Sequence, residues 1–226
     1  MKPRIVALVP MRHESERVPG KNYRPFAGEP LYHHIVGTLL ACPHIAEVVI
    51  NTDSQVIIDD ARQRFPRVRL IERPERLRGG HIPMNDILLH DVTLVQADYY
   101  LQTHSTNPLL RVETVTRAIE LFLQEYPRHD SLFSVTRIQT RLWDAQARAV
   151  NHDPAVLLRT QDLPPIFEEN SNLYIFGWDT LERRGNRLGE HPLMFEMDQL
   201  ETWDIDDQTD FEIAETLFHR RREEGP

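Results

Sequence analysis

Three cations follow the first apolar run of the sequence within a short polar segment. The run spans residues 5–10, and Arg12, Arg17 and Lys21 come directly after it. In an open α/β sheet such loops lie where ligands bind, and guanidinium and ammonium groups at this density suit the charges of a nucleotide triphosphate. The alternative is a solvated loop whose cations pair with Glu14 and Glu16. The segment lacks GxxxxGK[ST], so it is not a Walker-type phosphate loop.

A carboxylate pair near the end of the chain offers a metal site. Asp204 and Asp206 are separated by one residue, so on an extended segment both side chains project from the same face. Two carboxylates held together need a cation, and oxygen ligands beside a triphosphate favour Mg²⁺. The alternative is that Asp206, Asp207 or Asp210 caps the final helix, a role that we expect of Asp207. We therefore predict Asp204 and Asp206 as the metal ligands.

An alternating α/β framework is predicted to position these side chains. Apolar runs and β-rich segments predict strands at residues 5–10, 48–50, 68–71, 99–103, 131–136 and 173–176. Apolar residues at helical spacing predict helices at residues 31–41, 55–65, 85–95 and 112–125, and a closing helix around Phe211, Ala214 and Phe218. The alternation indicates a doubly wound, mostly parallel sheet with right-handed crossovers. We expect a single domain over residues 1–226.

One segment does not fit the alternation. Periodicity fades over residues 139–165, which hold Trp143 and the pair Pro164-Pro165. We expect this segment to protrude from the sheet.

Composition narrows the classes of partner. The net charge of -9 arises from 35 acidic against 26 basic residues, and this acidic balance disfavours binding to nucleic acid. No apolar stretch approaches the ~20 residues that span a bilayer, and the first residues show no signal-peptide pattern. The single cysteine, Cys42, has no internal disulfide partner. We expect a cytoplasmic protein that binds no membrane.

The motifs resemble those of a known family in order along nearly the whole chain. The loop string Ser15-x-Arg17-x-Pro19-Gly20-Lys21-Asn22, preceded by Arg12, resembles the opening of the CMP-sialic acid synthetases, the acylneuraminate cytidylyltransferases. Further matches follow: Asn51-Thr52-Asp53 to "STD", Arg73-Pro74-x-x-Leu77 to "RPxxL", Ser105-Thr106-Asn107-Pro108-Leu109 to "PTSPL", Gln161-Asp162-Leu163-Pro164 to "RQDLP", and Asn170-Ser171-x-x-Tyr174 to "NGxxY".

The resemblance assigns site residues in three groups. It places Arg12, Lys21 and Asn22 on CTP, with Arg17 as a further phosphate contact. It makes Arg73 and the backbone near Gly79 and Gly80 candidates for reading cytosine, against the alternative that Arg73 is a surface residue before a turn. It places Gln102, His104, Thr106, Gln161 and Tyr174 near the nucleotide and the sugar, although His104 could instead only cap a strand end.

The resemblance also implies a fold and a reaction. The fold is a Rossmann-like nucleotidyltransferase, whose protruding segment forms a homodimer and whose partner completes the sugar pocket. The reaction joins CMP from CTP to an acidic nine-carbon sugar of the sialic acid type with release of pyrophosphate. Arg12, Lys21 and Asp206 are the expected catalytic residues, with Mg²⁺ on Asp204 and Asp206.

The sequence departs from the family pattern at several positions. They are His13-Glu14 in place of two glycines, Gly80 in place of aspartate, His104 in place of glutamine, Thr160 in place of arginine, and Ser171 in place of glycine. Because the departures include residues near the sugar, legionaminic, pseudaminic and eight-carbon ulosonic acids remain alternative substrates. A non-catalytic nucleotide-sugar binding protein on the same fold is a further alternative.

Overall fold

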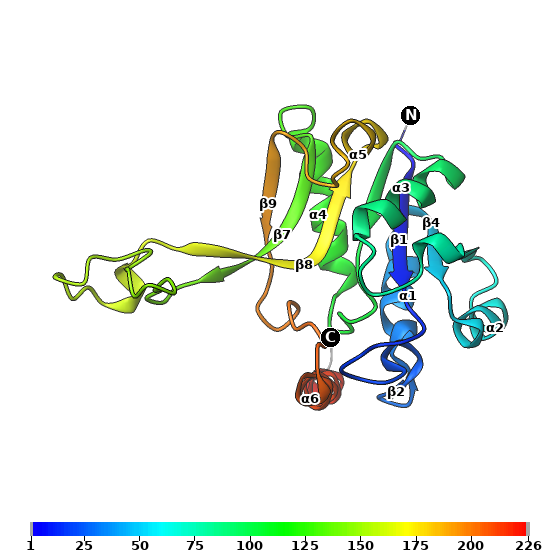
Figure 1. The fold of residues 1–226 in the computed structure, drawn as a ribbon, viewed down its shortest axis with the longest axis horizontal. Helices are drawn as coiled ribbons and strands as arrows, with labels where there is room; N and C mark the ends of the chain where they lie inside the picture. Colours follow the sequence, from blue (N-terminus) through cyan, green and yellow to red (C-terminus); the bar gives the residue numbers. More distant parts are fainter. Residues whose placement is uncertain (1, 225–226) are drawn as a thin grey trace.

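A seven-stranded sheet organises the computed structural model, which describes residues 2–224. The strand order is β5-β4-β1-β6-β8-β7-β9 (Figure 1). The strands are β1 (Ile5–Met11), β4 (Ile45–Thr52), β5 (Arg69–Glu72), β6 (Tyr99–Gln102), β7 (Ser131–Ile138), β8 (Ile166–Phe176) and β9 (Pro192–Glu196). Only β8 runs antiparallel to its neighbours within this sheet. The predicted doubly wound, mostly parallel α/β architecture is confirmed.

Helices cover both faces of the sheet. On one face lie α1 (Leu31–Ala41), α2 (Gln55–Arg64) and α4 (Val112–Glu125), and on the other α3 (Met84–Leu94) and α5 (Trp178–Arg184) (Figure 1). Side chains alternate along β1, so Ala7 and Val9 join the first core while Val6 and Leu8 join the second. Every residue of β1 is buried, which accounts for the unbroken apolar run.

The last helix packs on a small hairpin rather than on the sheet. Helix α6 (Gln208–Glu224) meets the hairpin of β2 (Pro25–Phe26) and β3 (Glu29–Pro30) through the Phe26 ring, whose centroid lies 5.5 Å from that of Phe211. The Asp207 carboxylate accepts a hydrogen bond from the Asp210 backbone at 3.0 Å, and the Asp210 carboxylate accepts one from the Asp207 backbone at 3.1 Å. This reciprocal cap confirms the role predicted for Asp207.

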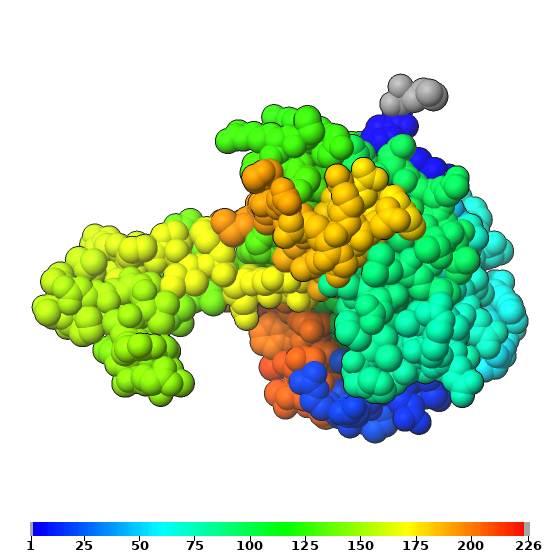
Figure 2. Space-filling model, turned by 45° about the horizontal axis from the view of Figure 1, so that its top comes forward, coloured from blue at the N-terminus to red at the C-terminus, as the bar shows by residue number. Residues whose placement is uncertain are grey.

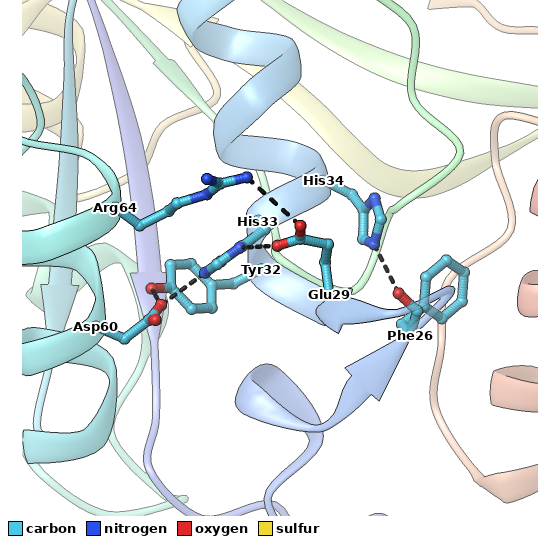
Figure 3. Close-up of polar contacts among 7 residues, drawn as sticks. All are labelled: Phe26, Glu29, Tyr32, His33, His34, Asp60 and Arg64. Carbon is cyan, nitrogen blue, oxygen red and sulfur yellow. Dashed lines mark hydrogen bonds and ion pairs between the residues drawn. The ribbon is translucent and has the colours of Figure 1, made fainter.

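A polar cluster joins this hairpin to α1 and α2, and we call it the His33 cluster (Figure 3). His33 lies 2.9 Å from a Glu29 oxygen through Nδ1 and 2.6 Å from an Asp60 oxygen through Nε2. The Tyr32 hydroxyl also donates to Asp60, and Arg64 reaches Glu29 at 3.4 Å. The cluster consists of Glu29, Tyr32, His33, Asp60 and Arg64, and it ties three chain segments together.

An arm projects from the sheet where the sequence loses periodicity. Strands β7 and β8 run on together beyond the body of the sheet and lead into residues 139–165, which protrude to one side (Figures 1 and 2). Trp143 is 52% exposed and Leu157 is 90% exposed on this arm. No helix within residues 2–224 has the length and apolar character needed to cross a membrane.

Several features of the fold were not predicted. Helix α5, strand β9 and the hairpin of β2 and β3 have no expected counterpart, and β8 begins at Ile166 rather than near residue 173. In β9 only Phe195 is buried, and the apolar run of residues 193–195 is too short to single out a strand. The first half of β8 belongs to the arm, where partly exposed polar residues replace the core pattern.

Candidate active site

A cavity of about 500 Å³ lies beyond the carboxyl end of β1. The loops after β1, β5 and β6 and the segment before α6 contribute to its wall. The lining includes most of the predicted site residues: Arg12, Arg17, Lys21, Asn22, Arg73, Gly79, Gly80, His104, Thr106, Asp204 and Asp206. Gln102, Gln161 and Tyr174 are not among the lining residues. The structure therefore brings together segments that lie far apart in the sequence.

The loop cations face the carboxylates that precede α6. Lys21, in the short helix η1 (Lys21–Tyr23), is 9% exposed and donates to the Ile205 carbonyl. Burial lowers the pKa of Lys21, while the charges of Asp204 and Asp206 oppose that shift. Arg17 Nη2 lies 2.6 Å from Asp206 Oδ1 in a pair exposed to solvent. The free site thus places a buried ammonium beside two carboxylates.

Asn22 braces the loop. Its Nδ2 donates to the Arg12 carbonyl at 2.7 Å, and its Oδ1 accepts from the Ser105 hydroxyl at 2.6 Å. The amide therefore links the loop after β1 to the loop after β6. Its contact with CTP stays a prediction.

Arg73 is buried, and its interpretation as a surface arginine is wrong. The side chain is 1% exposed, and its Nε and Nη2 donate to Asn51 Oδ1 at 2.6 Å and to the Asn51 carbonyl at 3.1 Å. Asn51 Nδ2 donates in turn to Asp91 Oδ1 at 2.5 Å. Burial lowers the pKa of Arg73 and raises that of Asp91. A polar network buried in the sheet edge thus holds the guanidinium at the cavity wall.

The turn at Gly79 and Gly80 brings backbone close to the first loop. Gly79 has φ +104°, a conformation that side chains disfavour. A Cβ added at Gly80 would lie 2.8 Å from Arg12 Nη1 and 3.2 Å from Glu16 Oε1. The space beside Gly80, where the family pattern has an aspartate, is therefore occupied by the Arg12 guanidinium and by another carboxylate, that of Glu16.

His13 points away from the cavity. Its backbone donates to Asp53 Oδ1 at 2.7 Å, its Nδ1 lies 2.7 Å from Ser54 Oγ, and its ring stacks on Tyr23 with centroids 5.3 Å apart. Glu14, by contrast, contributes to the lining. The replacement of the first family glycine by His13 therefore leaves the cavity open.

Asp204 and Asp206 both line the cavity. The Asp204 side chain is exposed at the cavity. The protein atoms around the cavity still reduce its solvation, and this loss of solvation raises its pKa. The charge of Asp206 adds to the shift, and a hydrogen bond from Thr106 opposes it. The Asp206 side chain pairs with Arg17 and leaves the helix cap to Asp207. No group of three or more His, Cys, Asp or Glu side chains within residues 2–224 is arranged as a metal site.

Arg187 is a residue that the sequence analysis missed. Its guanidinium lies 3.5 Å from the centroid of the Tyr174 ring, and its Nη1 donates to Gln102 Oε1 at 2.5 Å. Gln102 is fully buried and touches His104, whereas the Tyr174 hydroxyl donates to Glu169 and accepts from the Ser171 hydroxyl at 3.1 Å. Gln102 and Tyr174 thus lie behind the cavity wall. An arginine in a polar loop carries no sequence signal that would single it out.

Two further residues clarify the departures from the family pattern. Ser171 lines the cavity and has φ +58°, so the backbone keeps the left-handed conformation that suits the family's glycine. Gln161 lies in the short helix η3 (Thr160–Asp162) on the arm, where Gln139 donates to its carbonyl at 3.4 Å. Within one chain, Gln161 therefore stands apart from the other predicted residues.

Comparison with known proteins identifies the family. A CMP-N,N'-diacetyllegionaminic acid synthase from Legionella pneumophila is 29% identical over 97% of this chain and 98% of its own length. N-acylneuraminate cytidylyltransferase A from Danio rerio is 27% identical over 93% of this chain, which corresponds to 50% of its own length. The solved structure of a CMP:2-keto-3-deoxy-manno-octonic acid synthetase complexed with CTP shares the fold, with a TM-score of 0.72, 17% identity, and coverage of 96% of this chain and 99% of its own. The cytidylyltransferase family model matches residues 6–224, and the chain therefore belongs to the cytidylyltransferase family.

Proposed function

We propose that this protein transfers CMP from CTP to an acidic nonulosonate sugar of the sialic acid type and releases pyrophosphate. One observation carries the proposal: Arg12, Arg17 and Lys21 line the same cavity as Asp204 and Asp206. Cations suited to a triphosphate and carboxylates suited to a divalent cation thus share one site. Family membership and relatives whose names specify legionaminic and neuraminic acids support the substrate class.

The reaction is an in-line displacement at phosphorus. The anomeric hydroxyl of the sugar attacks the α-phosphorus of CTP, the bond to the β,γ-diphosphate breaks, and the hydroxyl proton leaves to solvent. Such reactions depend mainly on positioning and charge neutralisation. Arg12 and Lys21 would hold the phosphates, while Asn22 fixes the loop that carries them. Arg73 and the Gly79–Gly80 backbone would face the cytosine at the far side of the cavity.

The carboxylate pair fits a magnesium ion. Burial raises the pKa of Asp204, and the charge of Asp206 raises it further. A cation bound at the pair would offset both the loss of solvation and the repulsion between the two carboxylates. When bound there, Mg²⁺ would neutralise charge on the phosphate oxygens and ease ionisation of the attacking hydroxyl. Asp204 and Asp206 would supply two oxygen ligands, leaving the others to phosphate and water.

A second cavity of about 460 Å³ is the candidate sugar site, because it shares Ser171, Asp204 and Asp206 with the first. Its lining also includes Glu168 and Glu169 but no lysine or arginine within residues 2–224. A sugar carboxylate bound there would lack a cationic partner from these residues. We therefore propose a homodimer in which the arm of a second copy, with its exposed Trp143, completes the sugar site.

Pyrophosphate release tests the activity. The protein is incubated with Mg²⁺, one nucleotide and a panel of neuraminic, legionaminic, pseudaminic and eight-carbon ulosonic acids. We expect release with CTP and a nine-carbon acid, and much less with ATP or GTP, because a site matched to a pyrimidine edge excludes a purine. Equal release from ATP would overturn the cytidine assignment, and no release with any acid would favour a binding protein.

Sedimentation tests the homodimer. We expect a dimer at micromolar concentration, and we expect Trp143→Ser to shift the equilibrium towards monomer. Trp178→Ser is the matched control, because Trp178 lies on α5, on the body of the molecule rather than on the arm. A monomeric wild-type protein would refute the arm-mediated assembly.

A cytoplasmic location is part of the same proposal. The only cysteine, Cys42, is a buried free thiol, as is usual in a compartment where disulfides are rare. Cell fractionation tests this location, and recovery outside the cytoplasmic fraction would contradict it.

A further inference from the structure

His104 has a position in the cavity wall that the proposed reaction does not explain. It follows β6 and lines the cavity, and its Nε2 lies 3.2 Å from Gln102 Nε2. An imidazole nitrogen facing an amide nitrogen has two possible roles, donor or acceptor. The partners of Gln102 decide between them.

Arg187 determines which way the Gln102 amide faces. A guanidinium can only donate, so the Gln102 atom that lies 2.5 Å from Arg187 Nη1 must be the carbonyl oxygen. The other terminal atom is then the NH₂ group, which also donates to the Thr103 carbonyl at 3.1 Å. Two independent contacts therefore agree on one amide orientation.

The amide in turn determines the tautomer of His104. The Gln102 NH₂ group can only donate, so His104 Nε2 accepts and carries no proton. A neutral ring must then hold its proton on Nδ1. Nδ1 has no hydrogen-bond partner among the described side chains and backbone of residues 2–224. The structure thus leaves one N–H group of a cavity-lining ring unused.

The surroundings of the ring keep it neutral. Burial, together with the charges of the nearby cations Arg187 and Lys21, lowers the pKa of His104 to about 4. Such a ring is a weak base at neutral pH, and Gln102 already occupies its only lone pair. His104 is therefore poorly suited to accept the proton of an attacking hydroxyl.

We propose that His104 binds an anionic oxygen of the substrate as a neutral Nδ1–H donor, and that Gln102 and Arg187 are the residues that position this donor. The proposal rests on the proposed function for the identity of the substrates. The oxygen belongs either to the triphosphate or to the sugar carboxylate, since both would lie in this part of the molecule. The hydrogen bonds run in one direction: the partly buried Arg187 donates to Gln102, Gln102 donates to His104, and His104 keeps its Nδ1–H donor for a ligand in the cavity.

The tautomer is tested first, on the 226-residue protein in the absence of nucleotide and sugar. Long-range ¹H–¹⁵N spectra of protein labelled at histidine distinguish the two tautomers and the imidazolium, and the His104 signals are assigned by their loss in His104→Asn. We expect the Nδ1–H tautomer throughout the range from about pH 6 to about pH 8. A protonated Nε2 or a titrating ring in that range would overturn the proposal, whether or not the protein turns over CTP.

The positioning residues are tested by the same signal. Arg187→Met and Gln102→Leu should convert His104 to a mixture of tautomers. Arg183→Met is the matched control, because Arg183 lies on α5 with an exposed side chain and contacts Asp179 rather than Gln102. An unchanged single tautomer in both variants would overturn their positioning role.

Kinetics then identify the oxygen. His104→Leu removes the donor and should raise a KM about tenfold or more, with little change in thermal unfolding. His104→Asn places an amide N–H near the position of Nδ1 and should recover most of the loss. A raised KM for CTP, with weaker CTP binding in the absence of sugar, identifies a phosphate oxygen. A raised KM for the sugar acid alone identifies its carboxylate. Wild-type kinetics in His104→Leu would overturn the proposal, and absence of turnover in the wild type would contradict the proposed function instead.

Discussion

Two polar regions of this molecule differ in how the charges within them are compensated. In the His33 cluster, each carboxylate meets donors from the protein, and these contacts lower the pKa of Glu29 and, against partial burial, that of Asp60. In the cavity, burial is the largest influence: it lowers the pKa of Lys21 and Arg73 and raises that of Asp204. The charges of the cluster are satisfied internally, whereas those of the cavity are only partly compensated.

The two histidines show the same contrast. Each nitrogen of His33 faces a carboxylate oxygen, Nδ1 that of Glu29 at 2.9 Å and Nε2 that of Asp60 at 2.6 Å (Figure 3). His104 has cations as its charged neighbours and an amide donor at Nε2. The polar groups of the His33 cluster thus have partners without a ligand, whereas a ligand in the cavity would supply partners that the protein itself does not provide. Variants in the cavity should therefore change activity more than stability, and variants in the cluster should do the reverse.

The largest expected effect is that of Asp206→Asn. The change removes one charge of the carboxylate pair, so activity should fall by about 10²-fold or more, and raised Mg²⁺ should restore part of it. Thermal stability should stay nearly unchanged, because the Arg17–Asp206 pair is exposed and Asp207 provides the helix cap. Pyrophosphate release and calorimetry measure the two properties.

Asp207→Asn is the matched control for this variant. Asparagine is a good capping residue, so both stability and turnover should be kept. Full activity of Asp206→Asn at ordinary Mg²⁺ would remove Asp206 from the site and weaken the contrast between the two regions.

Lys21→Ala should have the next largest effect. Losing a charged hydrogen bond to phosphate should cost about 2 kcal/mol in kcat/KM for CTP. Stability should change little, because burial disfavours the charge of Lys21 in the free protein. The stabilisation of the protein by CTP in a thermal shift assay should diminish. Lys2→Ala is the control, because it alters an exposed lysine, and it should behave as the wild type. If Lys21→Ala also behaved as the wild type, the loop after β1 would be a solvated segment without a role in binding CTP.

Much of the fold follows from patterns that depend on burial. The runs in β1 and β4 predict strands because both faces of the sheet are covered, and the periodicity in α1 and α4 predicts helices because one face of each is buried. Strand β9 has a single buried residue, and α5 is a short helix, so neither leaves a comparable pattern. These two short elements are therefore the ones that the sequence does not reveal.

The sequence predicts site residues that belong to local motifs and misses those that act through contacts between distant parts of the chain. Arg12, Lys21 and Asp204 belong to local motifs that also lie together in the structure. Arg187 acts through Gln102, a contact across 85 positions of the chain that no local spacing encodes. Glu16 beside Gly80 likewise becomes visible only when the two loops are folded together. Roles that depend on tertiary contact could not be predicted from one sequence.

Asp60→Asn tests the His33 cluster, the region whose variants should change stability more than activity. It weakens the hydrogen bonds from His33 and Tyr32, and it should lower the free energy of unfolding by about 1 kcal/mol, a modest value because the Asp60 side chain is 40% exposed. Activity per folded molecule should be kept. Asp59→Asn is the matched control, since Asp59 is an exposed neighbour that pairs loosely with Arg62 at 3.6 Å. A loss of turnover in Asp60→Asn without loss of stability would break the comparison.

The smallest expected effect is the pH dependence of the same cluster. Despite partial burial, hydrogen bonds from Tyr32 and His33 lower the pKa of folded Asp60 below its ordinary value of 3.8. A carboxyl group whose pKa is lower when folded contributes its stability above the unfolded pKa and loses it as the pH falls through the folded pKa. The difference in unfolding free energy between wild type and Asp60→Asn should therefore be constant near neutral pH and shrink below about pH 4. Denaturant titrations across this range measure it. A difference that grew on acidification would mean that the pKa of Asp60 is raised by folding, and the cluster would then resemble the cavity, where Asp204 has that sign.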